Sequence, residues 1–181
     1  GKFRRQRQMC IRDSLRSDSV AQEKKNYSIS NDETNIVLGT GGSGETKRVP
    51  SKIFLEVMKN TLKRGKCKFF IATGNAKEEI EILDQILKSD LKEFCIPLNN
   101  LNISKIIPII KNCDVSICND SSFSHLSAAL NIPTIVLMAD TPLVYGSYSS
   151  LMHPILPEGA NTVSHDTCLL YTSDAADETC R

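Results

Sequence analysis

The 181-residue chain carries 22 Lys and Arg against 21 Asp and Glu, and the net charge of +1 argues against a nucleic acid as its main partner. Hydrophobic residues make up 40% of the chain, enough for the core of one domain, whereas an aromatic content of 6% with no Trp disfavours a surface that stacks bases. No stretch of 18 apolar residues and no N-terminal apolar segment is present, so we expect neither a membrane span nor a signal peptide.

The two ends of the chain are related at the level of DNA. Residues 4–13 read RRQRQMCIRD, and a nucleotide sequence that encodes them also encodes CLLYTSDAAD, residues 168–177, on its opposite strand in a shifted frame. Both segments therefore resemble translated sequencing-adapter DNA, and we interpret residues 1–14 and 168–181 as adapter-derived tails. The native part is then residues 15–167, a fragment of a longer reading frame.

Short apolar strands alternate with amphipathic helices along the middle of the chain. Residues 15–34 come first; they are polar, charged and without periodicity, so we expect a linker or a frayed end there. The apolar runs that predict strands are residues 35–39, 68–73, 94–97, 115–118 and 134–138. The segments that predict helices are residues 50–64, 76–88, 104–111 and 123–130. From residue 149 onward, Pro and Gly interrupt any period, and we expect a loop that packs across the domain.

This strict alternation predicts the fold class α/β, a Rossmann-like parallel sheet with helices on both faces and right-handed crossovers. We expect it to form one domain over residues 35–167. In such a sheet, ligands bind where the carboxyl ends of strands meet the N-termini of helices. Two polar loops that follow apolar strands, residues 39–47 and 119–125, are therefore the places to look for a site.

Four of the seven cysteines lie in the native part: Cys67, Cys95, Cys113 and Cys118. No two of them form a CxxC pair, and most lie within apolar runs. We interpret them as free thiols that behave as small hydrophobic residues in a reducing, cytoplasmic compartment. The spacing also argues against a zinc site, and we expect no bound metal.

The loop at residues 39–47 (GTGGSGETK) is rich in glycine. Its glycine spacing is that of a phosphate-binding P-loop, but the Lys-Ser or Lys-Thr pair that should follow Gly44 is missing, so we reject an ordinary NTPase. Backbone amides of the loop, the Ser43 hydroxyl and the Lys47 ammonium group can still hold a diphosphate. A flexible turn with a solvated lysine accounts for the same residues equally well.

A second polar cluster, at residues 119–125 (NDSSFSH), joins a predicted strand to a predicted helix. Asp120, Ser121 and Ser122 fall where a helix N-terminus attracts anions, and His125 lies one turn further. A helix cap explains one of these residues and a structural histidine another, but neither explains the whole cluster. We expect this polar elbow and the lysine loop to meet above one edge of the sheet and to enclose a common cleft.

Glu78 lies at the start of the helix predicted at residues 76–88. A carboxylate in that position most often complements the helix dipole at the protein surface. It contributes to a site only if it faces the same cleft, where a carboxylate is a natural acceptor for two ribose hydroxyls.

These residues resemble the C-terminal half of the lipopolysaccharide heptosyltransferases, glycosyltransferase family 9. The family's Asp-Thr-Gly-x-x-His-Leu-x-x-Ala motif corresponds to Asp120–Ala129, with two serines in place of the Thr-Gly pair. Its Lys-x-Trp-Pro motif corresponds to Lys47–Pro50, with Val49 in place of the tryptophan. Its Gly-Pro-Tyr appears as Gly146–Tyr148, and its glutamate, four residues after a strand-ending glycine, corresponds to Glu78.

The resemblance implies the donor-binding domain of a GT-B type glycosyltransferase that moves a heptose from ADP-heptose, a nucleotide-diphosphate sugar, to a lipid-linked lipopolysaccharide core sugar. It implies neither a cofactor nor a metal-centred mechanism. The residues that it assigns to the donor are Ser43, Lys47, Ser121 and Ser122 on the diphosphate, Asp120 on sugar hydroxyls, His125 on a phosphate or sugar oxygen and Glu78 on the ribose. The catalytic base and the acceptor site belong to an N-terminal domain, so this chain alone should bind nucleotide sugar without turnover. The parent enzyme is expected in the cytoplasm, peripheral to the inner membrane.

Two other functions fit the same residues. A non-catalytic nucleotide- or nucleotide-sugar-binding module would use the same crevice as a sensor or a partner surface. Another GT-B type sugar-nucleotide enzyme, such as an epimerase, would differ in the donor sugar. A purely structural scaffold fits least well, because it leaves the polar cluster at residues 119–125 unexplained.

Overall fold

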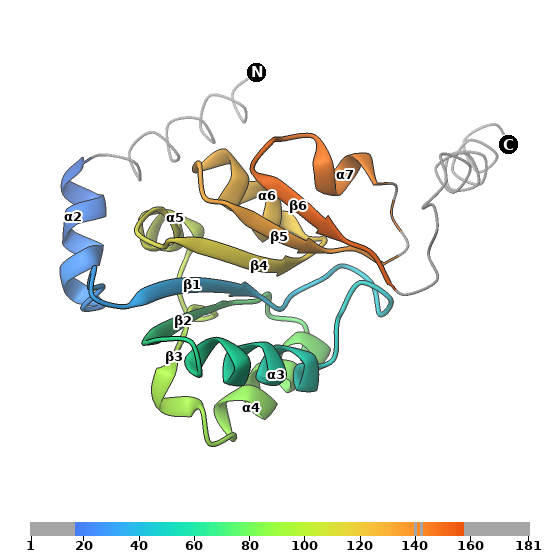
Figure 1. The fold of residues 1–181 in the computed structure, drawn as a ribbon, viewed down its shortest axis with the longest axis horizontal. Coiled ribbons are helices and arrows are strands. Elements are labelled where there is room, and N and C mark those ends of the chain that lie inside the picture. Colours follow the sequence, from blue (N-terminus) through green and yellow to red (C-terminus); the bar gives the residue numbers. More distant parts are fainter. Residues whose placement is uncertain (1–16, 140, 142, 158–181) are drawn as a thin grey trace, which may run out of the picture.

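The computed structural model describes residues 17–139, 141 and 143–157, and it confirms the α/β fold class. Within these residues, six strands form one parallel sheet in the order β3-β2-β1-β4-β5-β6 (Figure 1). The strands are β1 (Thr34–Gly39), β2 (Cys67–Ala72), β3 (Cys95–Pro97), β4 (Val115–Asn119), β5 (Thr134–Leu137) and β6 (Met152–Ile155). The helices are α2 (Ser17–Asn26), α3 (Ser51–Leu62), α4 (Lys77–Leu87), α5 (Ile103–Lys111), α6 (Ser122–Ala129) and α7 (Val144–Ser147), with a 3₁₀ turn, η1 (Lys92–Phe94). The expected tails at residues 1–14 and 168–181 lie outside the described residues.

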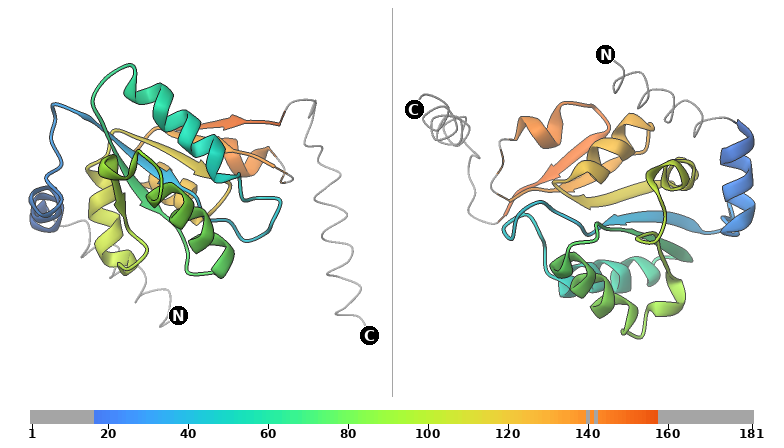
Figure 2. Two further views of the ribbon diagram at one scale, coloured as in Figure 1. Left: turned by 90° about the horizontal axis from the view of Figure 1, so that it is seen from below. Right: turned by 180° about the vertical axis from the view of Figure 1, so that it is seen from behind.

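Helices cover both faces of the sheet (Figure 2), and the alternation of side chains along β1 shows how each face forms its own core. Ile36 and Leu38 belong to a buried cluster with α3 and α4, whereas Val37, between them, belongs to a cluster with α5. Successive residues of a strand point to opposite faces, so a strand buried on both sides is apolar throughout. This is why the run at residues 35–39 lacks the alternation of a half-exposed strand.

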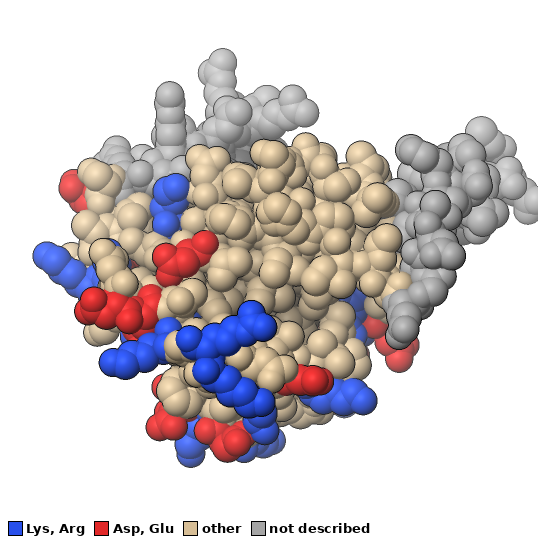
Figure 3. Space-filling model, viewed as in Figure 1, with Lys and Arg blue, Asp and Glu red and all other residues tan. Residues whose placement is uncertain are grey.

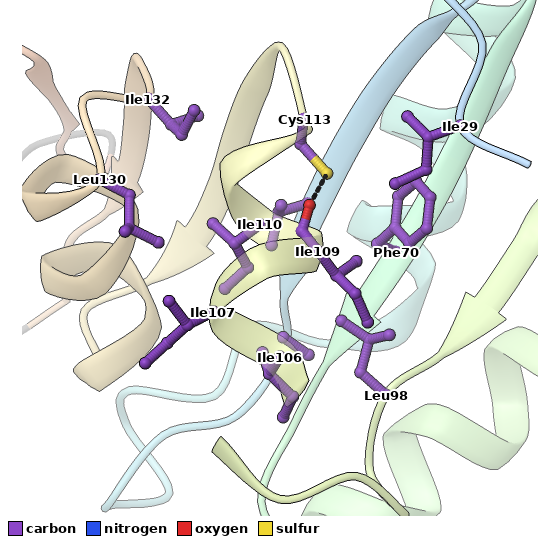
Figure 4. Close-up of a cluster of buried hydrophobic side chains, with 12 residues drawn as sticks. Ile29, Phe70, Leu98, Ile106, Ile107, Ile109, Ile110, Cys113, Leu130 and Ile132 are labelled. Atoms are coloured by element: carbon purple, nitrogen blue, oxygen red, sulfur yellow. Dashed lines mark hydrogen bonds between the residues drawn. The ribbon is translucent and has the colours of Figure 1, made fainter. Parts of the chain in front are cut away.

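The core on the α5 side is built mainly from isoleucines (Figure 4). Ile107, Ile109 and Ile110 of α5 are 0–2% exposed and pack in one cluster with Phe70 of β2. Cys113 follows the helix, and its thiol donates to the Ile109 carbonyl at 3.4 Å. The thiol is therefore part of the core, as the sequence predicts for a free cysteine in an apolar run.

All four cysteines of the described residues are free. Cys67, Cys113 and Cys118 are buried, and Cys95 is partly buried. Burial disfavours the charged thiolate, and it raises the pKa of Cys95 and of Cys118 to about 11. These cysteines are therefore neutral, unreactive thiols near pH 7.

The linker predicted at residues 15–34 is wrong for its central part, because α2 spans Ser17–Asn26. The helix is held from α5: Asn112 Nδ2 donates to the Val20 carbonyl at 2.8 Å, and Lys105 pairs with the nearly buried Glu23 at 3.3 Å. These partners are polar and come from residues more than 80 positions away. The segment has no apolar stripe, so the helical period that sequence analysis relies on is missing.

The loop predicted from residue 149 onward is wrong for residues 152–155, because β6 adds a sixth strand beside β5. Its part beyond residue 157 lies outside the described residues. The strand contains Pro154, which faces Val136 across the pairing. Proline is confined to edge strands, where its missing N–H need not enter the ladder, and β6 is an edge strand. The proline that argues against a strand in the sequence is thus compatible with this position.

Candidate functional site

The strand order reverses between β1 and β4, which lie side by side in the middle of the sheet. In an open parallel sheet, the crevice outside the carboxyl ends at such a reversal is the usual ligand position. The loop after β1 and the elbow after β4 both begin there, since Gly39 is paired with Cys118. The fold therefore brings the two polar segments selected from the sequence to one edge.

The two segments meet through an ion pair. Lys47 Nζ lies 3.2 Å from Asp120 Oδ2, across 73 positions of the chain. The Lys47 side chain is 24% exposed and that of Asp120 is 5% exposed, so the lysine is reachable from solvent and the carboxylate is not. The expected meeting of the lysine loop and the elbow is confirmed, and the common cleft around it stays a prediction.

Asp120 is held by three contacts, of which the ion pair with Lys47 is the first. Its Oδ2 also accepts a short hydrogen bond from the Thr141 hydroxyl, and its backbone N–H donates to the Leu137 carbonyl at 3.2 Å. Between residues 115 and 157 the sequence has no Lys or Arg, and Figure 3 shows few charged side chains over β5, β6 and α7. A buried carboxylate needs a compensating positive charge, and Lys47 in the loop after β1 supplies it to Asp120.

The helix-cap explanation of the elbow fails in detail. Ser121, not Asp120, occupies the N-cap position of α6, and its side chain makes no capping hydrogen bond. The Ser121 Oγ is buried without a partner among the described residues, and Ser122 is exposed at the first position of the helix. Neither hydroxyl is therefore used to complete the helix end, and both stand beside its free backbone amides.

His125 is half-buried and pairs with Tyr148. Its Nδ1 lies 3.1 Å from the tyrosine hydroxyl, and the two rings stack with centroids 5.5 Å apart. Tyr148 is not among the site residues predicted from the sequence, although it closes the Gly146–Tyr148 match, which was the signal available. A hydrogen bond at one ring nitrogen leaves the other nitrogen to face a ligand.

The first part of the glycine loop, residues 40–42, is held by side chains from several segments. Asn119, fully buried at the end of β4, donates from its side-chain amide to the Thr40 carbonyl at 2.9 Å. Arg48 donates to the Gly42 carbonyl at 3.1 Å, and the Gly42 N–H donates to Glu79 Oε1 at 3.0 Å. Side chains from β4, the loop itself and α4 thus hold the backbone of residues 40–42. Asn119 and Glu79 were missed, because their role depends on the neighbouring segment.

Two of the selected residues lie apart from these contacts. Ser43 and Glu78 are both exposed, at the tip of the loop and in the first turn of α4. The acidic side chain that α4 brings to the glycine loop is Glu79, the next residue. Glu79 occupies the third position of α4, but Ala76 at the N-cap has no hydroxyl, so the sequence lacks the full capping-box pattern that would have marked it. The roles of Ser43 and Glu78 toward a ligand stay predictions.

Several buried side-chain oxygens at this edge have no hydrogen-bond partner within the part of the chain that the structure describes. They are Thr40 Oγ1, Thr73 Oγ1, Asn119 Oδ1 and Ser121 Oγ, which follow or end β1, β2 and β4. An unsatisfied buried polar group costs about 1–3 kcal/mol, so such groups gather where a ligand or water completes them. Neither threonine could be predicted from the sequence, because a threonine after a strand carries no signal by itself.

The described residues contain neither a cluster of metal ligands nor a membrane-spanning helix. No three His, Cys, Asp or Glu side chains converge there as a metal site requires, and the expectation of no metal stays a prediction. Among the helices of residues 17–157 that the structure describes, none has the length and apolar character needed to cross a membrane.

Comparison with known proteins decides the family. The sequence model of glycosyltransferase family 9 (heptosyltransferase) matches residues 5–166, most of the chain. The chain belongs to glycosyltransferase family 9. The resemblance read from the motifs at Lys47 and Asp120 is thereby confirmed.

Curated relatives of this family 9 chain carry heptosyltransferase names. It is 32% identical over 106 residues to lipooligosaccharide heptosyltransferase 2 of Haemophilus influenzae, and 27% identical over 138 residues to lipopolysaccharide heptosyltransferase 1 of Campylobacter coli. These matches cover 56% and 72% of the chain. They cover 30% and 39% of the relatives, so the chain matches less than half of each relative's length.

Solved structures agree on the fold. E. coli ADP-heptose lps heptosyltransferase II matches with a TM-score of 0.67 and 20% identity, over 91% of this chain and 53% of that one. E. coli heptosyltransferase WaaC, solved with ADP, matches with a TM-score of 0.63 and 17% identity, over 82% and 45%. WaaC was also solved with ADP-2-deoxy-2-fluoro heptose. The family 9 chain thus has the α/β architecture of about half of a GT-B heptosyltransferase.

Proposed function

We propose that this chain is the donor-binding, C-terminal half of a heptosyltransferase, which transfers a heptose from ADP-heptose to a lipopolysaccharide core acceptor. The observation that carries the proposal is the pairing of Lys47 with Asp120 at the carboxyl edge of β1 and β4. Family membership supplies the reaction class, and the ADP and ADP-sugar ligands of the WaaC structures supply the donor class. A nucleotide sugar is therefore the partner that we assign to this edge.

In this proposal the Lys47 ammonium group exchanges its ion pair with Asp120 for one with the diphosphate of the donor. The lysine is the more exposed member of the pair, and its flexible stem lets the ammonium group turn toward solvent. Ser43, Ser121, Ser122 and the backbone amides at the start of α6 then bind the remaining phosphate oxygens. Negative charge grows on the departing ADP in the transition state, so these donors would stabilise bond breaking as well as binding.

The sugar and the ribose would be held by the other selected residues. Asp120, still bonded to Thr141 and uncovered once Lys47 has turned toward the diphosphate, accepts hydrogen bonds from sugar hydroxyls. His125 donates to a phosphate or sugar oxygen from the ring nitrogen that Tyr148 leaves free. Glu78 accepts from the ribose hydroxyls. Each role follows from the donor and acceptor inventory of the side chain.

The other half of the transferase would bind the acceptor sugar and supply the base that deprotonates it. We propose that the 181 residues alone bind donor and transfer no sugar, since positioning and general-base catalysis each contribute orders of magnitude to rate. We also propose that the parent enzyme acts in the cytoplasm, at the inner membrane surface where a lipid-linked acceptor is presented.

Titration calorimetry with ADP, UDP and GDP tests the donor site. We expect ADP to bind best, and Lys47→Ala to weaken it by at least tenfold, which corresponds to about 1.4 kcal/mol or more. Asp120→Ala should weaken ADP-sugar more than ADP, because its carboxylate is assigned to the sugar. Lys52→Ala, on the exposed face of α3, is the matched control. Equal, weak heats for all three nucleotides would exclude a donor site, and sugar transfer by this chain alone would exclude the proposed division of labour.

A further inference from the structure

The Glu79 carboxylate joins two segments that are far apart in the chain. Its Oε1 accepts from the Gly42 N–H at 3.0 Å, in the loop after β1, and its Oε2 accepts from the Ala76 N–H at 3.2 Å, just before α4. The Ala76 contact is the ordinary bond of a glutamate at the third position of a helix. The Gly42 contact is not, because it reaches out of the helix to another loop.

The Glu79 carboxylate occupies the space that side chains at Gly41 and Gly74 would need. A Cβ added to Gly41 would lie 2.7 Å from Glu79 Oε1, and a Cβ added to Gly74 would come still closer to Oε2. A side chain at either position would therefore displace the Glu79 carboxylate from where it lies. The backbone of both segments thus closes around the carboxylate, which is half-buried as a result.

The Gly42 backbone in turn borders Lys47. A Cβ on Gly42 would lie 3.0 Å from the Lys47 carbonyl oxygen, so the loop folds back on itself between these two residues. Arg48 donates to the Gly42 carbonyl at 3.1 Å from within the same loop. Fixing the Gly42 N–H therefore fixes the backbone from which the Lys47 side chain extends to Asp120.

We infer that Glu79 is a positioning residue of the donor site. It does not touch the donor; it holds the glycine loop so that Lys47 is directed toward Asp120 before a diphosphate arrives. This inference rests on the proposed function for its effect on binding, and on geometry alone for its effect on the loop. Preorganisation of this kind strengthens binding because less order is lost when the ligand arrives.

The test compares Glu79→Gln with Glu81→Gln, an exposed residue on the same helix that pairs with Lys77. Glutamine has a single acceptor oxygen, so either Gly42 or Ala76 loses its partner. We expect Glu79→Gln to weaken ADP binding about tenfold and to speed hydrogen exchange at the Gly42 amide at least tenfold, with both unchanged in Glu81→Gln. Glu79→Asp retains the charge but is shorter by one methylene, and it should show the same two effects if Glu79→Gln fails to fold.

A double-mutant cycle with Lys47→Ala separates positioning from general stability. If Glu79 acts through Lys47, Glu79→Gln should change ADP affinity less than twofold in the Lys47→Ala background. An undiminished tenfold loss in that background, or unchanged Gly42 exchange in both Glu79 variants, would overturn the inference. If the unmutated chain does not bind ADP, the proposed function fails, and Gly42 exchange still decides whether Glu79 fixes the loop.

Discussion

Asp120 illustrates how a single side chain depends on distant sequence. Its carboxylate is 5% exposed and would be strongly destabilising without a counter-charge, which Lys47 supplies at 3.2 Å. In the proposed function the donor phosphates compete for that lysine, while the Thr141 hydroxyl remains on the carboxylate. The ion pair is therefore both a structural contact and the feature that a ligand rearranges.

Cys118 allows a pH-dependent prediction at the same scale. Burial raises the pKa of its thiol from 9.0 to about 11, so between these pH values the unfolded chain releases a proton that the folded chain keeps. The free energy of unfolding therefore falls as pH rises through this interval, by up to about 1.4 kcal/mol per pH unit for this group. Cys118→Ala lacks this contribution, and its stability should fall less steeply with pH.

Denaturant unfolding at pH 8, 9, 10 and 11 under reducing conditions measures the two slopes. Lysines and tyrosines titrate in both proteins, so their contributions cancel in the difference between them. Parallel stability curves for Cys118→Ala and the unmutated chain would show that the thiol titrates alike in the folded and unfolded states.

Helix α2 shows an element whose formation depends on its partners. Summed propensity over Ser17–Asn26 is unremarkable, and no apolar stripe marks a buried face. Asn112 closes the end of α5 and bonds both to its own helix, at Pro108, and to α2, at Val20, each at 2.8 Å. One side chain thus joins the two helices.

Asn112→Ala should therefore loosen α2 selectively. Loss of its hydrogen bonds is expected to lower the free energy of unfolding by about 1–2 kcal/mol, because the Val20 and Pro108 carbonyls lose a partner. Hydrogen exchange should become faster over residues 17–26 before it does so in the sheet. Asn60→Ala, at a position exposed on α3, is the control and should leave hydrogen exchange over residues 17–26 unchanged. Uniformly faster exchange throughout the domain would contradict a local role.

At the scale of the whole molecule, the sheet separates two cores. Ile71 of β2 belongs to the cluster with α3 and α4, and Ile109 of α5 belongs to the cluster on the opposite face. Both are fully buried. We therefore expect that the loss of a methylene on one face leaves the packing of the other face undisturbed.

Ile71→Val and Ile109→Val should each destabilise the domain by about 1 kcal/mol, from the lost methylene and the cavity it leaves. The double variant should lose the sum to within about 0.5 kcal/mol, since the two sites share no partner. Urea unfolding of the four proteins measures this. A coupling above about 1 kcal/mol would mean that the sheet transmits packing changes between its faces.

Much of the fold could be predicted because the central strands are buried on both faces and therefore read as continuous apolar runs. The predictions failed where that signal was absent, at α2, whose partners are polar, and at β6, whose proline is acceptable only on an edge. The same contrast holds in the site. Lys47 and Asp120 could be selected because charged residues in polar loops after strands are informative, whereas Glu79 and Asn119 could not, because their partners are backbone groups of other segments.

The amino-acid sequence by itself determined the alternation of strands and helices, and with it a parallel sheet whose polar loops gather at one edge. Only the tertiary structure decided that Lys47 pairs with Asp120, that Glu79 rather than Glu78 contacts the glycine loop, and that β6 completes the sheet. The physical reason is that periodicity and loop chemistry are local properties of the chain. An ion pair across 73 positions, or a carboxylate enclosed by two glycines, exists only once the strands are in register.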